Sequence, residues 1–182
     1  MATKKPVVKA AVAKVSKKVI TKTAGDSAPK KGLSVGRVAP AFSLLSTDGG
    51  KVSLKELFGQ RVVLYFYPKD MTSGCTVEAH EFSAVAKEFK KKGTLVFGVS
   101  PDSIESHEKF IAKDGITFPL LADVDHKVAE KYGVWGERSM YGKKYMGIER
   151  STFVIGTDGK LEAIYRKVSP EGHAACVLEG LQ

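Results

Sequence analysis

The chain has 182 residues and a mass of 19.6 kDa, which suits one domain of ordinary size with a short appendage. Hydrophobic residues make up 43% of it and charged residues 27%, so a packed core is feasible. The sequence has no apolar run long enough for a membrane-spanning helix, and its two cysteines are too few for a disulfide-stabilised scaffold. The net charge of +9 at first favours a nucleic-acid-binding protein.

The positive charge is concentrated at the start of the chain. Residues 1–31 contain nine lysines and one acid, Asp26, whereas basic and acidic residues nearly balance in residues 32–182. The first segment also has no aromatic residue and buries little. We therefore expect a lysine-rich disordered tail at 1–31 and one folded domain at 32–182.

Three interpretations of this tail stay open. It is a solvated appendage, a segment that binds nucleic acid or another polyanion, or, less favoured because such peptides prefer arginine, an organelle presequence. Its composition is similar to that of linker-histone tails. A narrow stripe of valines at helical spacing runs through it, at Val8, Val12, Val15 and Val19.

The first half of the domain begins with a predicted hairpin over 42–52, followed by a short helix at 53–58. An unbroken apolar and aromatic run predicts a strand at 62–67 that is buried on both faces. A helix is expected at 75–91, since Phe82, Val85, Ala86 and Phe89 share one face.

The second half alternates strands and helices in the same way. The predicted elements are a strand at 94–99, a helix at 104–114, a strand at 118–122, a helix at 126–132, a long loop at 133–149, a hairpin of 151–155 with 160–166, and a helix at 171–181. This order predicts an α/β fold, a mixed sheet flanked by helices with a hairpin at its N-terminal end.

Cys75 is placed just past the end of the buried strand, in the first turn of a helix. The unpaired N–H groups and the dipole at that helix end favour an anion, so they favour the thiolate form of the sulfur. The carboxyl end of a sheet strand is also where open α/β sheets bind ligands. The alternative is that Cys75 is a small core residue, because it shares a helix face with Ala79 and Phe82.

The run Pro68-x-x-x-Thr72-x-x-Cys75 resembles the signature of the peroxiredoxins. The resemblance continues through Ser106-His107 and through Gly147-Ile-Glu-Arg150-Ser. Over about 34–182 the sequence is similar to the bacterioferritin-comigratory, or peroxiredoxin Q, branch of this family. This similarity implies a thioredoxin-like fold and a peroxidase that reduces hydrogen peroxide and organic hydroperoxides. Such a peroxidase needs no cofactor, and the histidines and cysteines have no metal-ligand spacing.

The resemblance implies a role for each of three residues around the sulfur. Cys75 matches the peroxidatic cysteine, which attacks the peroxide and becomes a sulfenic acid. The hydroxyl of Thr72 accepts a hydrogen bond from the peroxide while donating one to the sulfur, although a plain helix cap is the alternative. The backbone N–H groups of Cys75 and Gly74 donate to the substrate oxygens.

Three further residues complete the expected site. Arg150 matches the arginine that lies beside the thiolate and holds the oxygen that develops charge. Pro68 has no N–H and shields the sulfur from water, and Glu78 orients the arginine. On residue type alone, Arg150 would be a surface arginine and Pro68 a strand end.

The chain departs from the branch where a resolving cysteine is common, because His80 stands five residues after Cys75. The other thiol, Cys176, is in the last helix and is an incidental residue, a resolving cysteine within the chain, or a partner for another thiol. We predict a one-cysteine cycle in which an external low-molecular-weight thiol or a thioredoxin-like protein reduces the sulfenic acid. A thioredoxin-type reductase is excluded, since Thr72 takes the first position of the required C-x-x-C motif.

Two further expectations concern location and partners. Reduced thiols fit a cytoplasmic protein, with association to a nucleoid or nucleus through the basic tail as the alternative. The competing function is that of a nucleic-acid-associated basic protein whose tail is the main functional element. Members of the branch are often monomeric, so a monomer without a membrane partner is expected.

Overall fold

The structure is a computed structural model that describes residues 32–140 and 142–181. The predicted disordered tail lies outside the described residues, so the boundary after residue 31 stays a prediction. None of the helices in these two ranges is long and apolar enough to cross a membrane.

Nine strands are found in the described part of the chain. They are β1 (Ser43–Ser46), β2 (Lys51–Ser53), β3 (Arg61–Phe66), β4 (Thr94–Ser100), β5 (Leu120–Ala122), β6 (Trp135–Met140), β7 (Lys143–Ile148), β8 (Ser151–Ile155) and β9 (Leu161–Arg166). Seven form one sheet in the order β2-β1-β5-β4-β3-β8-β9. Strands β3, β4 and β5 run parallel, whereas β8, β9, β1 and β2 join antiparallel. The predicted mixed sheet with an N-terminal hairpin is confirmed.

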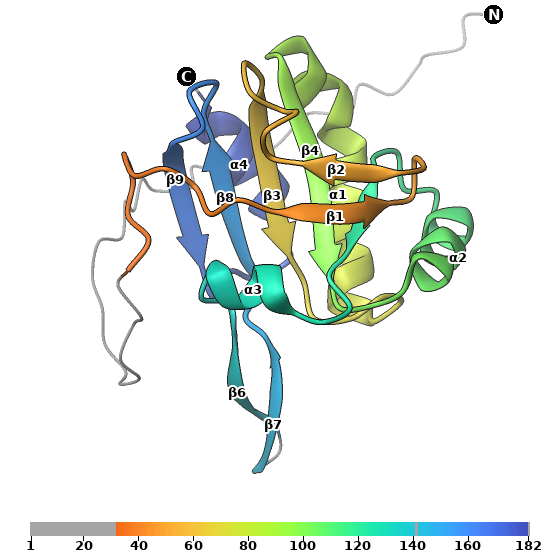
Figure 1. The fold of residues 1–182 in the computed structure, drawn as a ribbon. Coiled ribbons are helices and arrows are strands. Elements are labelled where there is room, and N and C mark those ends of the chain that lie inside the picture. Colours follow the sequence, from red (N-terminus) through yellow and green to blue (C-terminus); the bar gives the residue numbers. More distant parts are fainter. Residues whose placement is uncertain (1–31, 141, 182) are drawn as a thin grey trace, which may run out of the picture.

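Four helices flank this sheet: α1 (Ser73–Lys91), α2 (Ile104–Asp114), α3 (Lys127–Lys131) and α4 (His173–Gly180). Side chains of β3 alternate between two hydrophobic clusters, because successive residues of a strand point to opposite faces. Val63 and Tyr65 pack with residues of α1, α2 and α4, while Val62 and Leu64 pack with residues of α3 and β1. Figure 1 shows α3 on the opposite side of the sheet from α1 and α4. The burial of β3 on both faces, predicted from its apolar run, is confirmed.

The predicted short helix at 53–58 is wrong. The chain makes successive turns there, with Glu56 N–H donating to the carbonyl of Ser53 at 3.1 Å and Gln60 N–H to that of Leu57 at 3.0 Å. Phe58 at its end is 71% exposed. A six-residue segment with a mostly exposed apolar side chain gains too little from packing to offset the cost of helix nucleation.

The predicted long loop at 133–149 is also wrong, because β6 and β7 form an antiparallel hairpin there that projects away from the main sheet (Figure 1). The positive φ of 77° at Gly142 permits its tight turn. Most of its side chains are exposed, as in β7, so the sequence lacks the apolar alternation that predicts a half-buried strand.

The remaining predicted elements are confirmed: the helix at 104–114 and the strand at 151–155 have the predicted ends, and the others differ by one or two residues. One shift has a clear cause: Pro119 has no N–H for the sheet, so β5 begins at Leu120, two residues later than predicted. The helix α1 begins two residues earlier than predicted, at Ser73, with Cys75 inside its first turn.

Gly98 in the middle of β4 offers a test of the side-chain packing between neighbouring strands of the sheet. A Cβ on it would lie 2.7 Å from Leu120 and 2.8 Å from the ring of Tyr65, its two neighbours across the sheet. Both neighbours are buried and cannot move aside. We expect Gly98→Ala to lower the free energy of unfolding by about 1–3 kcal/mol in denaturant titrations.

The matched control is Gly136→Ala in β6, where an added Cβ has no heavy atom within 4 Å. It should change stability by no more than about 0.5 kcal/mol. Equal stabilities of the two variants would contradict this packing.

Candidate active site

Cys75 lies in the first turn of α1 and is only 1% exposed. It packs in the same hydrophobic cluster as Ala79 and Phe82, so the predicted shared face is present. The first helical hydrogen bond runs from Thr76 N–H to the carbonyl of Thr72 at 2.9 Å. The preceding N–H groups, among them those of Gly74 and Cys75, therefore have no acceptor within the helix and point outward from its positive end.

Arg150, 75 residues further along the chain, lies directly against this sulfur. Its Nη2 donates to Cys75 Sγ at 3.3 Å, and its Nη1 donates to Oε2 of Glu78. The sheet explains the meeting. Ser151 pairs with Phe66 at the carboxyl end of β3, which is also where the loop leading to Cys75 begins. The structure thus brings Cys75, Arg150 and Glu78 together.

Glu78 is a fully buried carboxylate on the turn of α1 that follows Cys75. Burial raises its pKa from 4.5 to about 7, and the charge and hydrogen bond of Arg150 oppose that rise. Burial tends to lower the pKa of Arg150, but Glu78 and Cys75 outweigh it, so that the pKa is raised. The guanidinium is therefore a fixed positive charge between a sulfur and a carboxylate.

Two neutral side chains complete the surroundings. Burial and Arg150 lower the pKa of His173 to about 4, and its Nε2 lies 2.7 Å from the hydroxyl of Thr152. Burial, followed by the carboxylate of Glu78 and the sulfur of Cys75, raises the pKa of Tyr65 well above its ordinary value. Both side chains are therefore uncharged at neutral pH, and the positive charge in contact with the sulfur is that of Arg150.

Thr72 occupies the N-cap position of α1 but makes no side-chain capping bond. Thr72 is exposed, and its hydroxyl donates to the carbonyl of Lys69 at 3.1 Å, so the expected donation to the sulfur of Cys75 is replaced here by a backbone contact. The arrangement differs from the plain helix cap that was the alternative. Pro68 is exposed immediately after β3. Gly74 fills a narrow gap, because a Cβ there would lie 3.4 Å from Nη2 of Arg150.

The second thiol belongs to a different surface. Cys176 is an exposed residue of α4, and both cysteines are free. His80 is also exposed, and its Nε2 lies 3.0 Å from the carbonyl of Asp114. It therefore lies on the surface, as a contact of α1 with the end of α2.

Sequence reasoning missed the residues that hold the loop between β3 and α1. Asp70 in this loop is buried and accepts hydrogen bonds from Tyr67, Ser106 and His107. Asp70 stands at a variable position of the signature, and the pair Ser106-His107 was only part of a resemblance. No local pattern indicates that they meet, since 36 residues separate Asp70 from Ser106.

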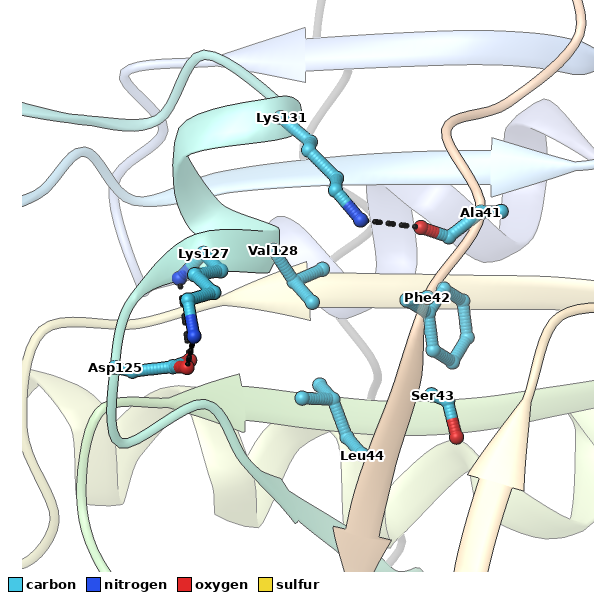
Figure 2. A pocket seen from close by; sticks show the side chains of 8 residues that line it. All are labelled: Ala41, Phe42, Ser43, Leu44, Asp125, Lys127, Val128 and Lys131. Atoms are coloured by element: carbon cyan, nitrogen blue, oxygen red, sulfur yellow. Dashed lines mark hydrogen bonds and ion pairs between the residues drawn. The ribbon is translucent and has the colours of Figure 1, made fainter.

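An open pocket of about 400 Å³ lies elsewhere, between β1 and α3 (Figure 2). Its cationic rim is already paired: Lys127 contacts Asp125 at 2.5 Å, and Lys131 donates to the carbonyl of Ala41 at 3.3 Å. Neither Cys75 nor Arg150 lines it. The chemistry-bearing cluster is therefore the one at the start of α1.

Comparison with known proteins agrees with this geometry. The model of the AhpC/TSA family matches residues 35–164. A Helicobacter pylori (strain J99) protein named for the peroxiredoxin Bcp is 52% identical over 149 residues, which cover 82% of this chain and 98% of that protein. Peroxiredoxin Bcp of Escherichia coli K12 is 45% identical over 150 residues, covering 82% of this chain and 96% of that protein.

A solved structure is similar over the same region. It is the bacterioferritin comigratory protein of Xanthomonas campestris, described for its alkyl peroxide reduction activity, with 43% identity and a TM-score of 0.73. The match covers 77% of this chain and 89% of that one. The chain therefore belongs to the AhpC/TSA family of peroxiredoxins, in the branch of Bcp and peroxiredoxin Q.

Proposed function

We propose that this protein is a thiol-dependent peroxidase that reduces hydrogen peroxide and organic hydroperoxides at Cys75. One observation carries the assignment: Nη2 of Arg150 donates to the sulfur at 3.3 Å in the first turn of α1. A thiolate at this position is stabilised by a fixed cation and by a helix end. The alkyl peroxide reduction of the Xanthomonas campestris relative supports organic hydroperoxides as substrates.

The chemical step uses the groups around the sulfur. The Cys75 thiolate attacks one peroxide oxygen, an S–O bond forms and the O–O bond breaks. The sulfur is oxidised to a sulfenic acid, while the other oxygen leaves as an alkoxide or hydroxide and is protonated to the alcohol or water. The guanidinium of Arg150 and the N–H groups of Gly74 and Cys75 stabilise the charge that develops on the oxygens.

Thr72, Pro68 and Glu78 support that step in different ways. The hydroxyl of Thr72 already donates to Lys69, so its lone pairs accept the hydrogen of the bound peroxide. Pro68 offers no N–H to the approaching oxygens and keeps water from the sulfur. Glu78 binds the other end of the Arg150 guanidinium and fixes its direction.

Reduction of the sulfenic acid uses an external thiol in this proposal. An external thiolate attacks the sulfur, water leaves, and a second thiol reduces the mixed disulfide and restores Cys75. Because Cys75 is 1% exposed, the first turn of α1 has to open before a thioredoxin-like protein reaches it. The proposal rests on the position five residues after Cys75, where His80 offers no thiol.

The lysine-rich residues 1–31 add a separate interaction in this proposal. Their excess of eight positive charges suits nucleic acid or another polyanion. The charge of the catalytic domain is nearly balanced, so the tail would locate a monomeric cytoplasmic enzyme rather than take part in its chemistry. This favours the peroxidase over the alternative in which the tail is the main functional element.

The first test replaces each cysteine in turn. Cys75→Ser removes the only nucleophile at the site, so we expect peroxide consumption with a thiol reductant to fall to background. Cys176→Ser, the matched control, should retain wild-type turnover. In intact-mass measurements, one equivalent of peroxide should add one oxygen to the reduced chain. An internal disulfide, seen as a loss of two hydrogens, would contradict the one-cysteine cycle.

The second test uses the raised pKa of Glu78. Between pH 4.5 and about 7 the folded protein binds this proton more tightly than the unfolded chain, because burial raises the pKa. The contribution of Glu78 to stability is therefore present at low pH and is lost as the pH rises through that window. We expect denaturant titrations to show this fall in wild type and not in Glu78→Gln.

The control for that measurement is Glu88→Gln, on an exposed position of the same helix. It should keep the wild-type pH dependence. A Glu78→Gln profile parallel to wild type across the window would show that the buried carboxylate does not titrate as described.

The third test removes residues 1–31. We expect peroxidase activity to be unchanged, while binding to duplex DNA, measured by fluorescence anisotropy, falls and loses its dependence on salt. Full-length protein that binds DNA no better than the truncated form would contradict the polyanion role. Loss of peroxidase activity on truncation would contradict the separation of tail and chemistry.

A further inference from the structure

The loop of residues 68–72 carries two groups of the proposed site, Pro68 and Thr72, and leads directly into the turn that holds Cys75. At its centre lies Asp70, whose side chain is buried. Its carboxylate accepts three side-chain hydrogen bonds, from Tyr67 at 2.7 Å, Ser106 at 2.7 Å and Nδ1 of His107 at 2.8 Å. Such bonds compensate for the burial of the charge.

The main chain of the same residue is held as well. Asp70 N–H donates to Oδ2 of Asp102 at 2.8 Å, and this oxygen also accepts from the hydroxyl of Ser100 at 2.7 Å. Ser100 ends β4 and Asp102 immediately precedes the N-cap of α2. Asp70 is therefore held through its side chain by residues of α2, and through its backbone by Asp102, which lies between β4 and α2.

One partner of Asp70, the imidazole of His107, makes few other polar contacts. His107 is fully buried, and its Nε2 has no hydrogen-bond partner among the described residues. Its ring is held only through Nδ1, which faces Asp70 at 2.8 Å and the Tyr67 hydroxyl at 3.4 Å. In the part of the chain that the structure describes, the polar contacts of the buried His107 ring are thus confined to Nδ1. This arrangement indicates that the role of His107 is to hold the Asp70 carboxylate.

The backbone of this loop adopts an unfavourable conformation at one residue, so it requires support from other contacts. Met71, next to Asp70, has a φ of 56°, in the left-handed region that non-glycine residues rarely adopt. Its side chain does not fix the loop from within, since the residue is 42% exposed. The conformation that puts Thr72 at the N-cap of α1 is therefore imposed by contacts outside Met71, and the contacts of Asp70 are adjacent to it.

We propose that Asp70 is a positioning residue of the peroxidase, which, with Tyr67, Ser106 and His107, holds residues 68–72 so that Thr72 and the start of α1 meet the peroxide. This inference rests on the proposed function. Asp70 touches neither Cys75 nor the substrate and acts through the loop. Reaction rates depend steeply on placement, so a shift of about 1 Å at Thr72 would slow oxidation of the sulfur by roughly 100-fold.

The test compares two reactions of the same thiol in the full-length chain. Oxidation of Cys75 by hydrogen peroxide, measured in a single turnover by quenching and intact mass, uses the placement of Thr72 and Arg150. Alkylation of Cys75 by iodoacetamide does not use the peroxide contacts. For Asp70→Asn we expect peroxide oxidation to slow by about 10- to 100-fold, and the ratio of the oxidation rate to the alkylation rate to fall at least tenfold.

The matched control is Asp123→Asn, which alters another buried carboxylate that bonds polar hydrogens. Asp123 accepts from the N–H groups of Val128 at 3.1 Å and Ala129 at 2.7 Å, at the start of α3. It should lower the melting temperature yet leave the ratio of the two rates within about twofold of wild type. Asp70→Asn with a wild-type ratio, or a fall in the ratio no larger than that of Asp123→Asn, would overturn the proposal.

Should Asp70→Asn fail to fold, the double variant Tyr67→Phe/Ser106→Ala decides the matter. It removes two of the three side-chain donors and keeps the carboxylate with His107. An intermediate loss of the rate ratio supports the proposal, and a wild-type ratio overturns it. The proposed function fails separately: it is contradicted if wild type does not react with peroxide at Cys75, whatever the Asp70 variants do.

Discussion

The site depends on one buried cation. The guanidinium of Arg150 touches the sulfur of Cys75 with one nitrogen and the carboxylate of Glu78 with another. A positive charge whose side chain is only 15% exposed is stable only when it is paired and hydrogen-bonded. Glu78 provides that pairing from the same helix as Cys75, one turn further on. The carboxylate therefore keeps the cation beside the sulfur whether or not the sulfur carries charge.

The fold places the cation at this point through several fixed contacts. Arg150 lies between β7 and β8, and its carbonyl accepts from Val168 N–H at 3.2 Å. The carboxylate of the preceding residue, Glu149, forms ion pairs with Arg166 at 2.6 Å and with Arg138 at 3.3 Å. These ion pairs join the base of the β6–β7 hairpin to β9. The backbone that carries Arg150 is thus held on both sides, and the side chain needs little ordering when peroxide binds.

The loop on the other side of the sulfur is held by a different set of bonds. Asp70 accepts hydrogen bonds from two residues of α2 and from Tyr67, which follows β3, so the sheet and α2 both hold the loop that leads into α1. Residues of α1 and Arg150, 75 residues further along the chain, meet at one sulfur. Each is supported by buried polar contacts rather than by its own sequence neighbours.

The parts of this picture that could be predicted are those with local causes. The apolar run of β3 predicts a buried strand, and the helical spacing after it places Cys75 in the first turn of a helix. Arg150 and Glu78 have no local signal that places them together, so they were reached only through resemblance to a family. Asp70 was missed because two of its three side-chain partners come from a helix 36 or more residues away. The β6–β7 hairpin was missed because its exposed strands lack apolar alternation.

The central claim is that Arg150 and Glu78 act on Cys75 as one unit. A double-mutant cycle measures this most directly, with the second-order rate of Cys75 oxidation by hydrogen peroxide in wild type, Arg150→Met, Glu78→Gln and the double variant. If the carboxylate acts by holding the guanidinium, its replacement should slow wild type about tenfold or more and have almost no effect once Arg150 is gone. Losses that multiply, so that Glu78→Gln slows both backgrounds equally, would contradict the account.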